Sequence, residues 1–329
     1  HSYILYSPTS LQDAFPRLPK HVTARILPFT RGWSQIRISF EFLFKKPDLL
    51  FVPAHTLPFI HPKKTITTIH DLGFKYFPEL YTPFEQVYHN WAQNVAVRYS
   101  SRIIAVSEYT KRDILRKYVI NPKRITVIYH GYDRALFHPR RDENPPIDVA
   151  NLGPYLFFIG RIERKKNITR LLEAYELLRR ERSIRHKLLL AGHPGFGYEE
   201  IKKKLQTLPP GIREDVKLLS YVDEERYATL LRFADVFVFP SLFEGFGLPV
   251  LEAMASGIPV VASNVTSIPE IVGSAGQLLD PLKPFEWASV LSRVLHSTKT
   301  RKSMIAKGLI RARSFSWEKA ADQLLGVFE

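Results

Sequence analysis

Short apolar runs alternate along the chain with longer segments whose apolar residues recur every three or four positions. The runs predict buried strands and the longer segments predict helices, which together are typical of parallel sheets covered by helices. In the first half the expected strands are Tyr3–Ser7, Val22–Pro28, Leu49–Val52, Thr65–Ile69, Ile103–Val106 and Ile125–Ile128, and the expected helices lie near Ile36–Phe44, Phe84–Tyr99 and Glu108–Lys117.

A second alternation follows a polar, proline-rich stretch. Residues 138–154 contain Arg140-Arg141-Asp142-Glu143-Asn144-Pro145-Pro146, have no apolar period and are interpreted as an interdomain linker. The strands expected beyond it are Tyr155–Ile159, Lys187–Ala191, Val216–Tyr221, Val236–Pro240 and Pro259–Ala262, the helices between them are Ile168–Arg182, Tyr198–Gln206, Glu224–Ala234 and Pro249–Ser256, and helices fill most of the remainder. We therefore predict an α/β protein with doubly wound parallel-sheet domains at 1–146 and 147–313. Ligands of such folds bind outside the carboxyl ends of the strands.

The length of 329 residues suits two such domains. The chain has no cysteine, so disulfides and thiolate ligands are excluded and a reducing, cytoplasmic compartment is the simplest interpretation. No apolar run approaches the ~20 residues that span a bilayer, and the first residues lack a signal-peptide pattern. We expect a soluble protein or one associated peripherally with the inner face of the membrane.

A net charge of +15 favours anionic partners. Residues 1–150 carry 21 Lys and Arg against 12 Asp and Glu, and residues 151–329 carry 26 against 20. Phosphate-bearing substrates and acidic membrane surfaces both fit, as does a basic surface kept for solubility. Because no zinc-ligand pattern and no RNA-binding aromatic signature accompanies the charge, nucleic acid is not an expected partner.

The segment from Phe239 to Gly257 carries the most chemical information. It follows an expected strand and opens a helix near Pro249. Gly245 and Gly247 let a ligand approach the backbone, and the free N–H groups of a helix start attract anions. This arrangement predicts a phosphate cradle.

Two glutamates flank that turn. Glu244 precedes it, Glu252 lies in the helix, and seven residues separate them, so both carboxylates can face one ligand and accept hydrogen bonds from sugar or ribose hydroxyls. The structural alternative is that Glu252 complements the helix dipole and that Glu244 is a solvated loop residue.

This segment resembles the glutamate-x7-glutamate motif of glycosyltransferase family 4. The resemblance implies the GT-B fold, transfer of a sugar with retention of anomeric configuration, and a closing helix at 314–329 that returns to the first domain. It also implies that Glu244, with Gly245, Phe246, Gly247 and Leu248, holds the donor sugar and its phosphates, and that Glu252 binds the ribose.

A second match follows the strand Tyr155–Ile159. Gly160-Arg161 with Lys166 five residues after the arginine is similar to the family's glycine-arginine turn. Two fixed cations can stabilise the charge of a departing nucleoside diphosphate without a metal, so Arg161 and Lys166 are catalytic candidates. Glu244 and His70 are the other two catalytic candidates. The adjacent Lys165 is an alternative partner, and a basic loop beside a helix start is the structural alternative. The sequence has no Asp-x-Asp, and we expect neither a metal nor a cofactor.

Two strand ends in the first half also look like the family. His70 follows the strand Thr65–Ile69, and by the resemblance it approaches the donor sugar; otherwise a lone histidine is structural. Asp71 orients His70 or caps the next element. Ser107 is expected to be an N-cap, and Asp71 and Ser107 are assigned to the acceptor side.

The basic helix that follows Ser107 has two interpretations. It is either an ordinary amphipathic surface helix or an interfacial one that brings the enzyme to a lipid-linked acceptor.

The nucleotide base is expected near the strand end that carries Tyr221 and Val222, and near the turn at Gly192. The spacing of Gly192, Gly195 and Gly197 is not a dinucleotide fingerprint. The sequence does not distinguish a purine from a pyrimidine.

The resemblance implies a hexosyltransferase acting on a saccharide or lipid-linked acceptor in cell-surface polysaccharide synthesis. GDP-mannose is the marginally preferred donor, ahead of UDP-glucose. Alternatives are a nucleotide-sugar epimerase or hydrolase on the same fold, and a non-catalytic nucleotide-sugar-binding protein. Members of the family usually begin with a strand and a glycine-rich loop on the acceptor side, and this sequence is expected to lack both.

Overall fold

The computed structural model describes residues 2–12, 15–140, 144–181 and 184–329. Residues 141–143 of the predicted linker, and Arg182 at the end of a predicted helix, lie outside this description. The chain divides into two compact units. The first comprises His1–Ile69, Pro83–Ile104 and Tyr118–Thr126, and the second comprises His70–Thr82, Ala105–Lys117 and Val127–Glu329. The second unit therefore includes the two segments that follow the strands ending at Ile69 and Ala105.

A four-stranded sheet is built from the first half of the chain, in the order β3-β4-β5-β6. Its strands are β3 (Leu49–Val52), β4 (Lys64–Ile69), β5 (Arg102–Ala105) and β6 (Ile125–Val127). The helices are α1 (Ile38–Phe44), which continues from a π-helical turn at Trp33–Arg37, α2 (Pro83–Tyr99) and α3 (Glu108–Lys117). Isoleucine and threonine dominate β4, and all but its first residue are buried. β-branched residues pack well on such a pleated surface.

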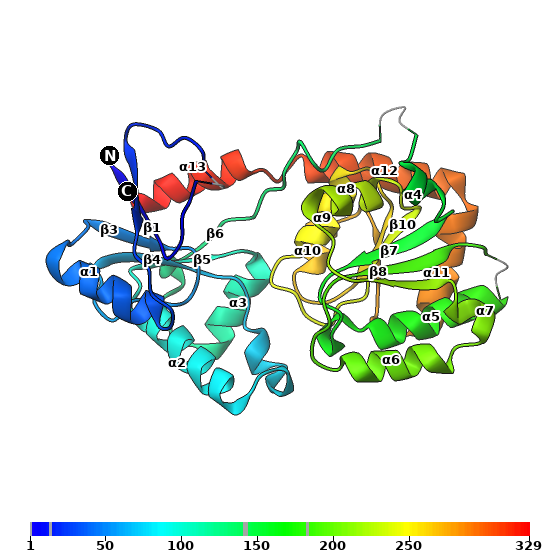
Figure 1. Ribbon diagram of the computed structural model, residues 1–329, viewed down its shortest axis with the longest axis horizontal. Coiled ribbons are helices and arrows are strands. Elements are labelled where there is room, and N and C mark those ends of the chain that lie inside the picture. The colour runs from blue at the N-terminus through cyan, green and yellow to red at the C-terminus, as the bar shows by residue number, and fades with distance from the viewer. Residues whose placement is uncertain (1, 13–14, 141–143, 182–183) are drawn as a thin grey trace. The chain divides into compact units, whose positions relative to one another are not determined.

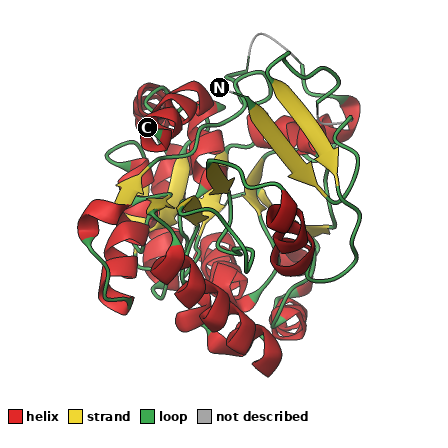
Figure 2. Cartoon of the chain, turned by 90° about the vertical axis from the view of Figure 1, so that its left-hand side faces the viewer, coloured by secondary structure: helices red, strands yellow, loops and turns green. Residues whose placement is uncertain are grey.

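The first two strands do not join this sheet. β1 (Tyr3–Ser7) and β2 (Val22–Ile26) form a parallel pair of their own, with Tyr3 aligned to Val22 (Figure 2). The predicted strand to Pro28 ends two residues early, although the Leu27 amide still donates to the Ser7 carbonyl, 2.8 Å away.

A six-stranded sheet forms the core of the second half, in the order β12-β11-β10-β7-β8-β9. Every neighbouring pair is parallel, which confirms the predicted parallel α/β class. The strands are β7 (Tyr155–Ile159), β8 (Lys187–Ala191), β9 (Val216–Leu219), β10 (Val236–Phe239), β11 (Val260–Ser263) and β12 (Gln277–Leu279). The order runs outward from β7 in both directions, so the topological switch point lies between β7 and β10.

Helices cover both faces of this sheet (Figure 1). They are α4 (Ile147–Ala150), α5 (Ile168–Glu181), α6 (Tyr198–Thr207), α7 (Pro210–Arg213), α8 (Glu224–Arg232), α9 (Leu248–Ala255), α10 (Ile268–Val272), α11 (Pro284–His296) and α12 (Thr298–Ala312). The last described helix of the chain is α13 (Trp317–Phe328). Because both faces are covered, the central strands are apolar except for Ser263 at the end of β11, and every residue of β10 and β11 is buried.

Among the described α-helices and strands, three short ones were not predicted. Helices α4 and α7 are each a single turn, and α4 lies inside the predicted linker. The edge strand β12 has only three residues, in a region predicted to be mostly helical. None of the three is long enough to show a period in the sequence.

Candidate functional site

The loops after β7 and β10 lie side by side at the switch point. The Leu242 amide donates to the Lys165 carbonyl at 2.9 Å, and the Asn167 side chain donates to the Pro240 carbonyl at 3.2 Å. Asn167 has a left-handed backbone (φ 59°) and ends a 3₁₀ turn at Arg164–Lys166. These bonds hold Lys166 against the glycine-rich segment that follows β10.

Lys166 forms an ion pair with Glu244, and both side chains are only 14% exposed. The Ser241 hydroxyl donates to the same Glu244 oxygen at 2.6 Å. The predicted cation and carboxylate thus come together, and Ser241 completes the cluster. Lys165, the alternative cation, contributes its backbone carbonyl to this loop.

Arg161 lies in the turn after β7 and is exposed. Within the described ranges it has no salt-bridge partner. A Cβ at Gly195 would lie 2.9 Å from the Arg161 side-chain carbons, and one at Gly192 would lie 2.0 Å from the Gly160 carbonyl oxygen. The two glycines therefore let the turn after β8 pack under Gly160 and Arg161, and leave the guanidinium available to an anion.

Gly245 is in contact with the segment that follows β4. A Cβ there would lie 1.9 Å from the His70 carbonyl oxygen. The Ser107 hydroxyl donates to the Gly245 carbonyl at 2.7 Å, and it also accepts a bond from the Thr110 amide at 3.0 Å, which makes Ser107 the predicted N-cap of α3. Three segments that are far apart in the sequence therefore meet at one glycine.

The rest of the glycine-rich turn is held by the two residues that precede α10. The Ser267 hydroxyl lies 3.0 Å from the Glu244 carbonyl and 2.9 Å from the Phe246 carbonyl, and the Glu244 amide donates to Thr266 Oγ1 at 3.1 Å. Gly247 has φ 104° and precedes Leu248, the first residue of α9. The Phe246 ring is buried, as are Gly245 and Gly247, so the turn is packed tightly into the protein.

Glu252 lies one turn into α9 and is bound by Tyr227 of α8, whose hydroxyl donates to Glu252 Oε2 at 2.6 Å. Burial raises the pKa of Glu252 to about 7, despite the opposing effect of the Tyr227 hydrogen bond. Desolvation disfavours the charged form of a carboxyl. Glu252 therefore changes charge near neutral pH.

His70 is exposed at the end of β4 and stacks on His130, which follows β6, with ring centroids 5.6 Å apart. Burial, and secondarily His70, lowers the pKa of His130 to about 4. His130 is therefore neutral at physiological pH. Asp71 Oδ1 accepts a bond from the Gly73 amide at 2.7 Å, so it caps the following turn, one of its two predicted roles.

The predicted base region presents two aromatic rings. Tyr221 is 64% exposed and stacks on His193, with centroids 5.2 Å apart and planes 16° apart. Val222 instead packs against the core. A flat exposed pair of this kind is a surface on which a base can stack.

The helix α3 has little apolar surface to offer a membrane. Ile114 is fully buried, and Tyr109 lies against the Phe243 ring at 5.9 Å. Glu270 of α10 accepts bonds from the Glu108 and Tyr109 amides, at 2.7 and 3.0 Å. This capping fixes α3 within the second unit, which favours an ordinary packed helix over an interfacial one.

Several residues of the site were missed by sequence reasoning. His130 follows the carboxyl end of a strand, as His70 does, so the strand-end argument could have found it. Ser241 lies three residues before Glu244. Tyr227 and Ser267 carry no local signal, because helix packing alone brings them to Glu252 and to the turn.

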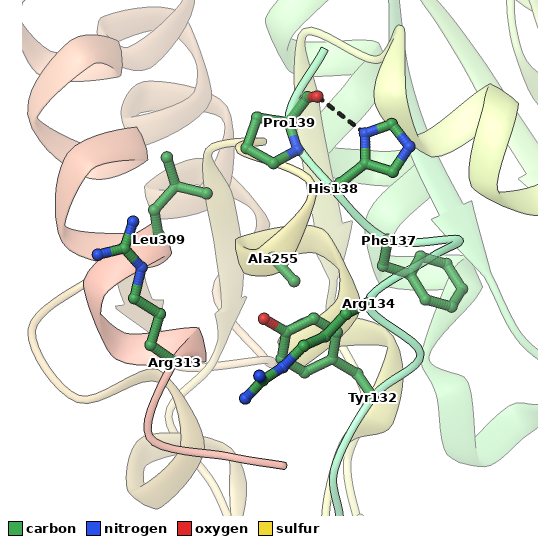
Figure 3. Close-up of a pocket in the computed structure, with 8 residues that line it drawn as sticks. All are labelled: Tyr132, Arg134, Phe137, His138, Pro139, Ala255, Leu309 and Arg313. Atoms are coloured by element: carbon green, nitrogen blue, oxygen red, sulfur yellow. Dashed lines mark hydrogen bonds between the residues drawn. The ribbon is translucent and has the colours of Figure 1, made fainter. Parts of the chain in front are cut away.

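In the described part of the chain, no three His, Asp or Glu side chains gather where they could hold a metal ion. No described helix is long and apolar enough to cross a membrane. A separate hollow has a volume of about 490 Å³ and is lined by none of the predicted site residues. Figure 3 shows the residues that line it. It is lined by Tyr132, Arg134, Phe137, His138, Pro139, Ala255, Leu309 and Arg313.

Known proteins resemble the chain along nearly its whole length. Residues 140–311 match the family model of glycosyl transferases group 1, and residues 4–136 match that of glycosyltransferase family 4. O-antigen chain mannosyltransferase B of Escherichia coli is 32% identical over 92% of this chain and 77% of its own length. The MMP alpha-(1->4)-mannosyltransferase of Mycolicibacterium hassiacum is 34% identical over 72% of this chain, which spans 56% of that relative.

A solved structure shares the fold. Anabaena HepE, crystallised with UDP-glucose, matches with a TM-score of 0.74 at 18% identity, over 99% of this chain and 100% of that one. With the two family models and the parallel sheets described above, this likeness confirms the GT-B fold class.

Proposed function

Because the chain belongs to the glycosyl transferases group 1 family, we propose that it moves a hexose from a nucleotide-sugar donor to an acceptor, with retention of configuration and without a metal. The observation that carries this proposal is the ion pair of Lys166 and Glu244 at the switch point, together with Arg161, which is exposed and has no ion-pair partner among the residues that the structure describes. The carboxylate of Glu244 can accept bonds from the hydroxyls of a ligand, and the cations of Lys166 and Arg161 can bind its diphosphate.

Arg161 and Lys166 would act on the leaving group. As the bond between the sugar C1 and the phosphate oxygen breaks, negative charge accumulates on the diphosphate, and fixed cations stabilise it. The Lys166 ammonium has three N–H donors. It can therefore keep one bond to Glu244 while it offers another to a phosphate oxygen.

Glu244 would bind a sugar hydroxyl rather than attack C1. Its Oε1 already accepts bonds from Lys166 and Ser241, which lowers its strength as a nucleophile. We therefore propose attack from the face that the diphosphate leaves. The acceptor oxygen bonds to C1, the C1–phosphate bond breaks, and the acceptor proton passes to the departing phosphate oxygen. His70 would contact the sugar from the strand end of β4.

Glu252 would accept bonds from the ribose hydroxyls, and Tyr221 would stack on the base. Both proposals draw on the contacts above: Glu252 is oriented by the Tyr227 hydroxyl, and Tyr221 is an exposed ring on His193. The remaining donor contacts would come from the backbone at Gly160 and from residues 245–248.

Mannose from GDP-mannose is our preferred donor, since both relatives named above are mannosyltransferases; the UDP-glucose bound by HepE keeps glucose as the second choice. The acceptor would be a saccharide or a lipid-linked saccharide of a cell-surface polysaccharide. We also propose functional domains at 1–146 and 147–313, with residues 314–329 returning to the first.

The test is a transfer assay with GDP-mannose or UDP-glucose, a panel of saccharide acceptors, and EDTA. We expect one donor to yield a product whose NMR coupling shows the donor's anomeric configuration, at a rate unchanged by EDTA. Inverted product would refute the retaining mechanism, and loss of activity with EDTA would refute metal independence. Conversion of the donor without any acceptor would favour an epimerase or hydrolase.

A further inference from the structure

The hollow drawn in Figure 3 lies within the second unit, to which all of its lining residues belong. One wall comes from residues 132–139, which follow β6. The other comes from the ends of α9 and α12, at Ala255, Leu309 and Arg313. Its volume of about 490 Å³ is within the range of pockets that hold small molecules.

The wall at residues 132–139 is fixed by hydrogen bonds. Asp133 Oδ1 accepts bonds from the amides of the second and third residues after it, at 2.7 and 3.2 Å. The Leu136 carbonyl accepts a bond from the Arg232 guanidinium of α8 at 3.0 Å. The Asp133 carboxylate is thus engaged with its own turn, and the exposed Arg134 extends from a backbone that is already ordered.

Both walls carry positive charge. Arg134 lies on one and Arg313 on the other, both are exposed, and none of the described residues that line the hollow is acidic. Neither guanidinium has an ion-pair partner in the described part of the chain; Arg134 acts electrostatically on Glu318, which is itself exposed. In Figure 3 the Arg134 guanidinium and the Tyr132 hydroxyl point toward the side of the hollow that carries Arg313. Guanidinium groups match the geometry of phosphate oxygens.

Helix dipoles do not explain this pair of cations. Arg313 is the C-cap residue of α12, where a cation is favoured whether or not a ligand binds. Arg134 belongs to no helix, so no dipole of its own element accounts for it. Two arginines from separate segments that line one hollow, with no carboxylate in its lining, indicate an anionic ligand.

The remaining lining suits a hydroxylated ring. His138 Nδ1 lies 3.0 Å from the Pro139 carbonyl oxygen, which can only accept a hydrogen bond. Nδ1 therefore carries the proton of the neutral imidazole, and Nε2 is left as an acceptor for a hydroxyl. Tyr132 adds a hydroxyl and an aromatic face, and Pro139 and Leu309 add apolar surface.

We propose that this hollow is a ligand site for a phosphorylated sugar, separate from the donor site. Arg134 and Arg313 bind the phosphate, and Tyr132 and His138 bind the hydroxyls of the ring. The site goes beyond the proposed transfer reaction, because none of the residues assigned to that reaction lines the hollow.

The experiment is calorimetric titration of the full chain with mannose 1-phosphate, mannose 6-phosphate and glucose 6-phosphate. Inorganic phosphate and mannose are titrated separately. At least one hexose phosphate should bind wild type about tenfold more tightly than either of these two probes, because each probe engages only part of the lining. Arg134→Gln and Arg313→Gln should each weaken that binding about tenfold, the loss expected when a hydrogen bond to a charged group is removed.

The matched control is a double variant, Arg213→Gln with Arg293→Gln, which neutralises two exposed arginines elsewhere in the second unit. It should bind the hexose phosphate as wild type does, so that a local contact is distinguished from a loss of net charge. Lys166→Gln should also bind it normally. Nucleotide binding should be unchanged in Arg134→Gln and Arg313→Gln, so failure of this site is separable from failure of the proposed donor site.

Four results would overturn the proposal. Wild type could bind none of the three hexose phosphates. The Arg134 and Arg313 variants could bind as tightly as the control. Lys166→Gln could abolish the binding, which would assign the sugar phosphate to the donor site. Inorganic phosphate could bind as tightly as the hexose phosphates, which would leave an anion site without a role for the sugar ring.

Discussion

Replacing Glu252 by glutamine should make the protein more stable at alkaline pH. Burial raises the pKa of this carboxyl from an ordinary 4.5 to about 7, so the folded protein holds a proton there that the unfolded chain has already lost. Between pH 4.5 and 7 the unfolded state binds fewer protons, and stability falls as pH rises. Glutamine has no proton to lose, and its carbonyl oxygen can still accept the Tyr227 hydrogen bond.

The magnitude follows from the pKa difference. At 1.36 kcal/mol for each pKa unit, the buried carboxylate costs about 3 kcal/mol above pH 7 and less than about 1 kcal/mol at pH 5. Glu252→Gln should therefore gain about 2 to 3 kcal/mol on wild type at pH 8.5. Most of that gain should vanish at pH 5.

Urea unfolding at the two pH values measures this effect, followed by a probe of the second unit so that its transition is resolved. Glu225→Gln is the matched control, because this glutamate is exposed on α8. It should change stability by the same small amount at both pH values. An equal effect of Glu252→Gln at pH 5 and 8.5 would refute the assignment of a buried, titrating carboxyl.

Three further substitutions test the contacts of the site. Gly245→Ala should lower the free energy of unfolding by about 2 kcal/mol or more, because its Cβ would lie 1.9 Å from the His70 carbonyl oxygen. The control Gly326→Ala, whose Cβ meets nothing within 4 Å, should be neutral or stabilising by about 0.5 to 1 kcal/mol. Equal effects of the two substitutions in urea unfolding would contradict this prediction. Ser107→Ala should lower the free energy of unfolding by about 1 to 2 kcal/mol in the same assay, because the N-cap of α3 and the buried hydrogen bond to the Gly245 carbonyl are lost together. An unchanged urea midpoint would argue against this role of Ser107. Tyr221→Ala should weaken the binding of a nucleoside diphosphate, measured by calorimetry, by about 1 to 3 kcal/mol, whereas Tyr221→Phe should leave the affinity unchanged. An equal loss of affinity in both variants would mean that the hydroxyl, not the ring, is used.

The parallel α/β architecture could be predicted because the apolar runs are long and uniform. β7 reads Tyr-Leu-Phe-Phe-Ile and β10 reads Val-Phe-Val-Phe, and both were placed to within a residue. Where a strand end was predicted wrongly, hydrogen bonds made by the following turn end the strand earlier than its apolar pattern does. The predicted strand Val216–Tyr221 stops at Leu219, where the Gly192 amide shares the Leu219 and Ser220 carbonyls.

Pairing between strands was beyond the sequence. β1 and β2 were predicted as strands but not as a separate pair, since periodicity reports which residues alternate and not which strands bond. The segments after β4 and β5 belong to the second unit for a similar reason. Their contacts depend on Gly245. In the sequence, this glycine indicates that another group approaches the backbone closely, but not which segment of the chain supplies it.

Within the candidate site, the sequence predicted the residues whose spacing is fixed by a loop. Lys166 and Glu244 follow β7 and β10, and the strand order alone brings those two strand ends together. Partners supplied by helix packing were not predictable: Tyr227 reaches Glu252 across two helices. The roles of all these residues in binding remain predictions.

The most direct test of the proposed donor site is calorimetric titration of GDP and UDP, with EDTA present, into wild type, Lys166→Gln and Lys165→Gln. The two lysines are neighbours, but only Lys166 is paired with Glu244. We expect that one nucleotide binds wild type, that Lys166→Gln weakens this binding about tenfold or more, and that Lys165→Gln leaves it nearly unchanged. No binding by wild type, or a larger loss at Lys165 than at Lys166, would contradict the donor site.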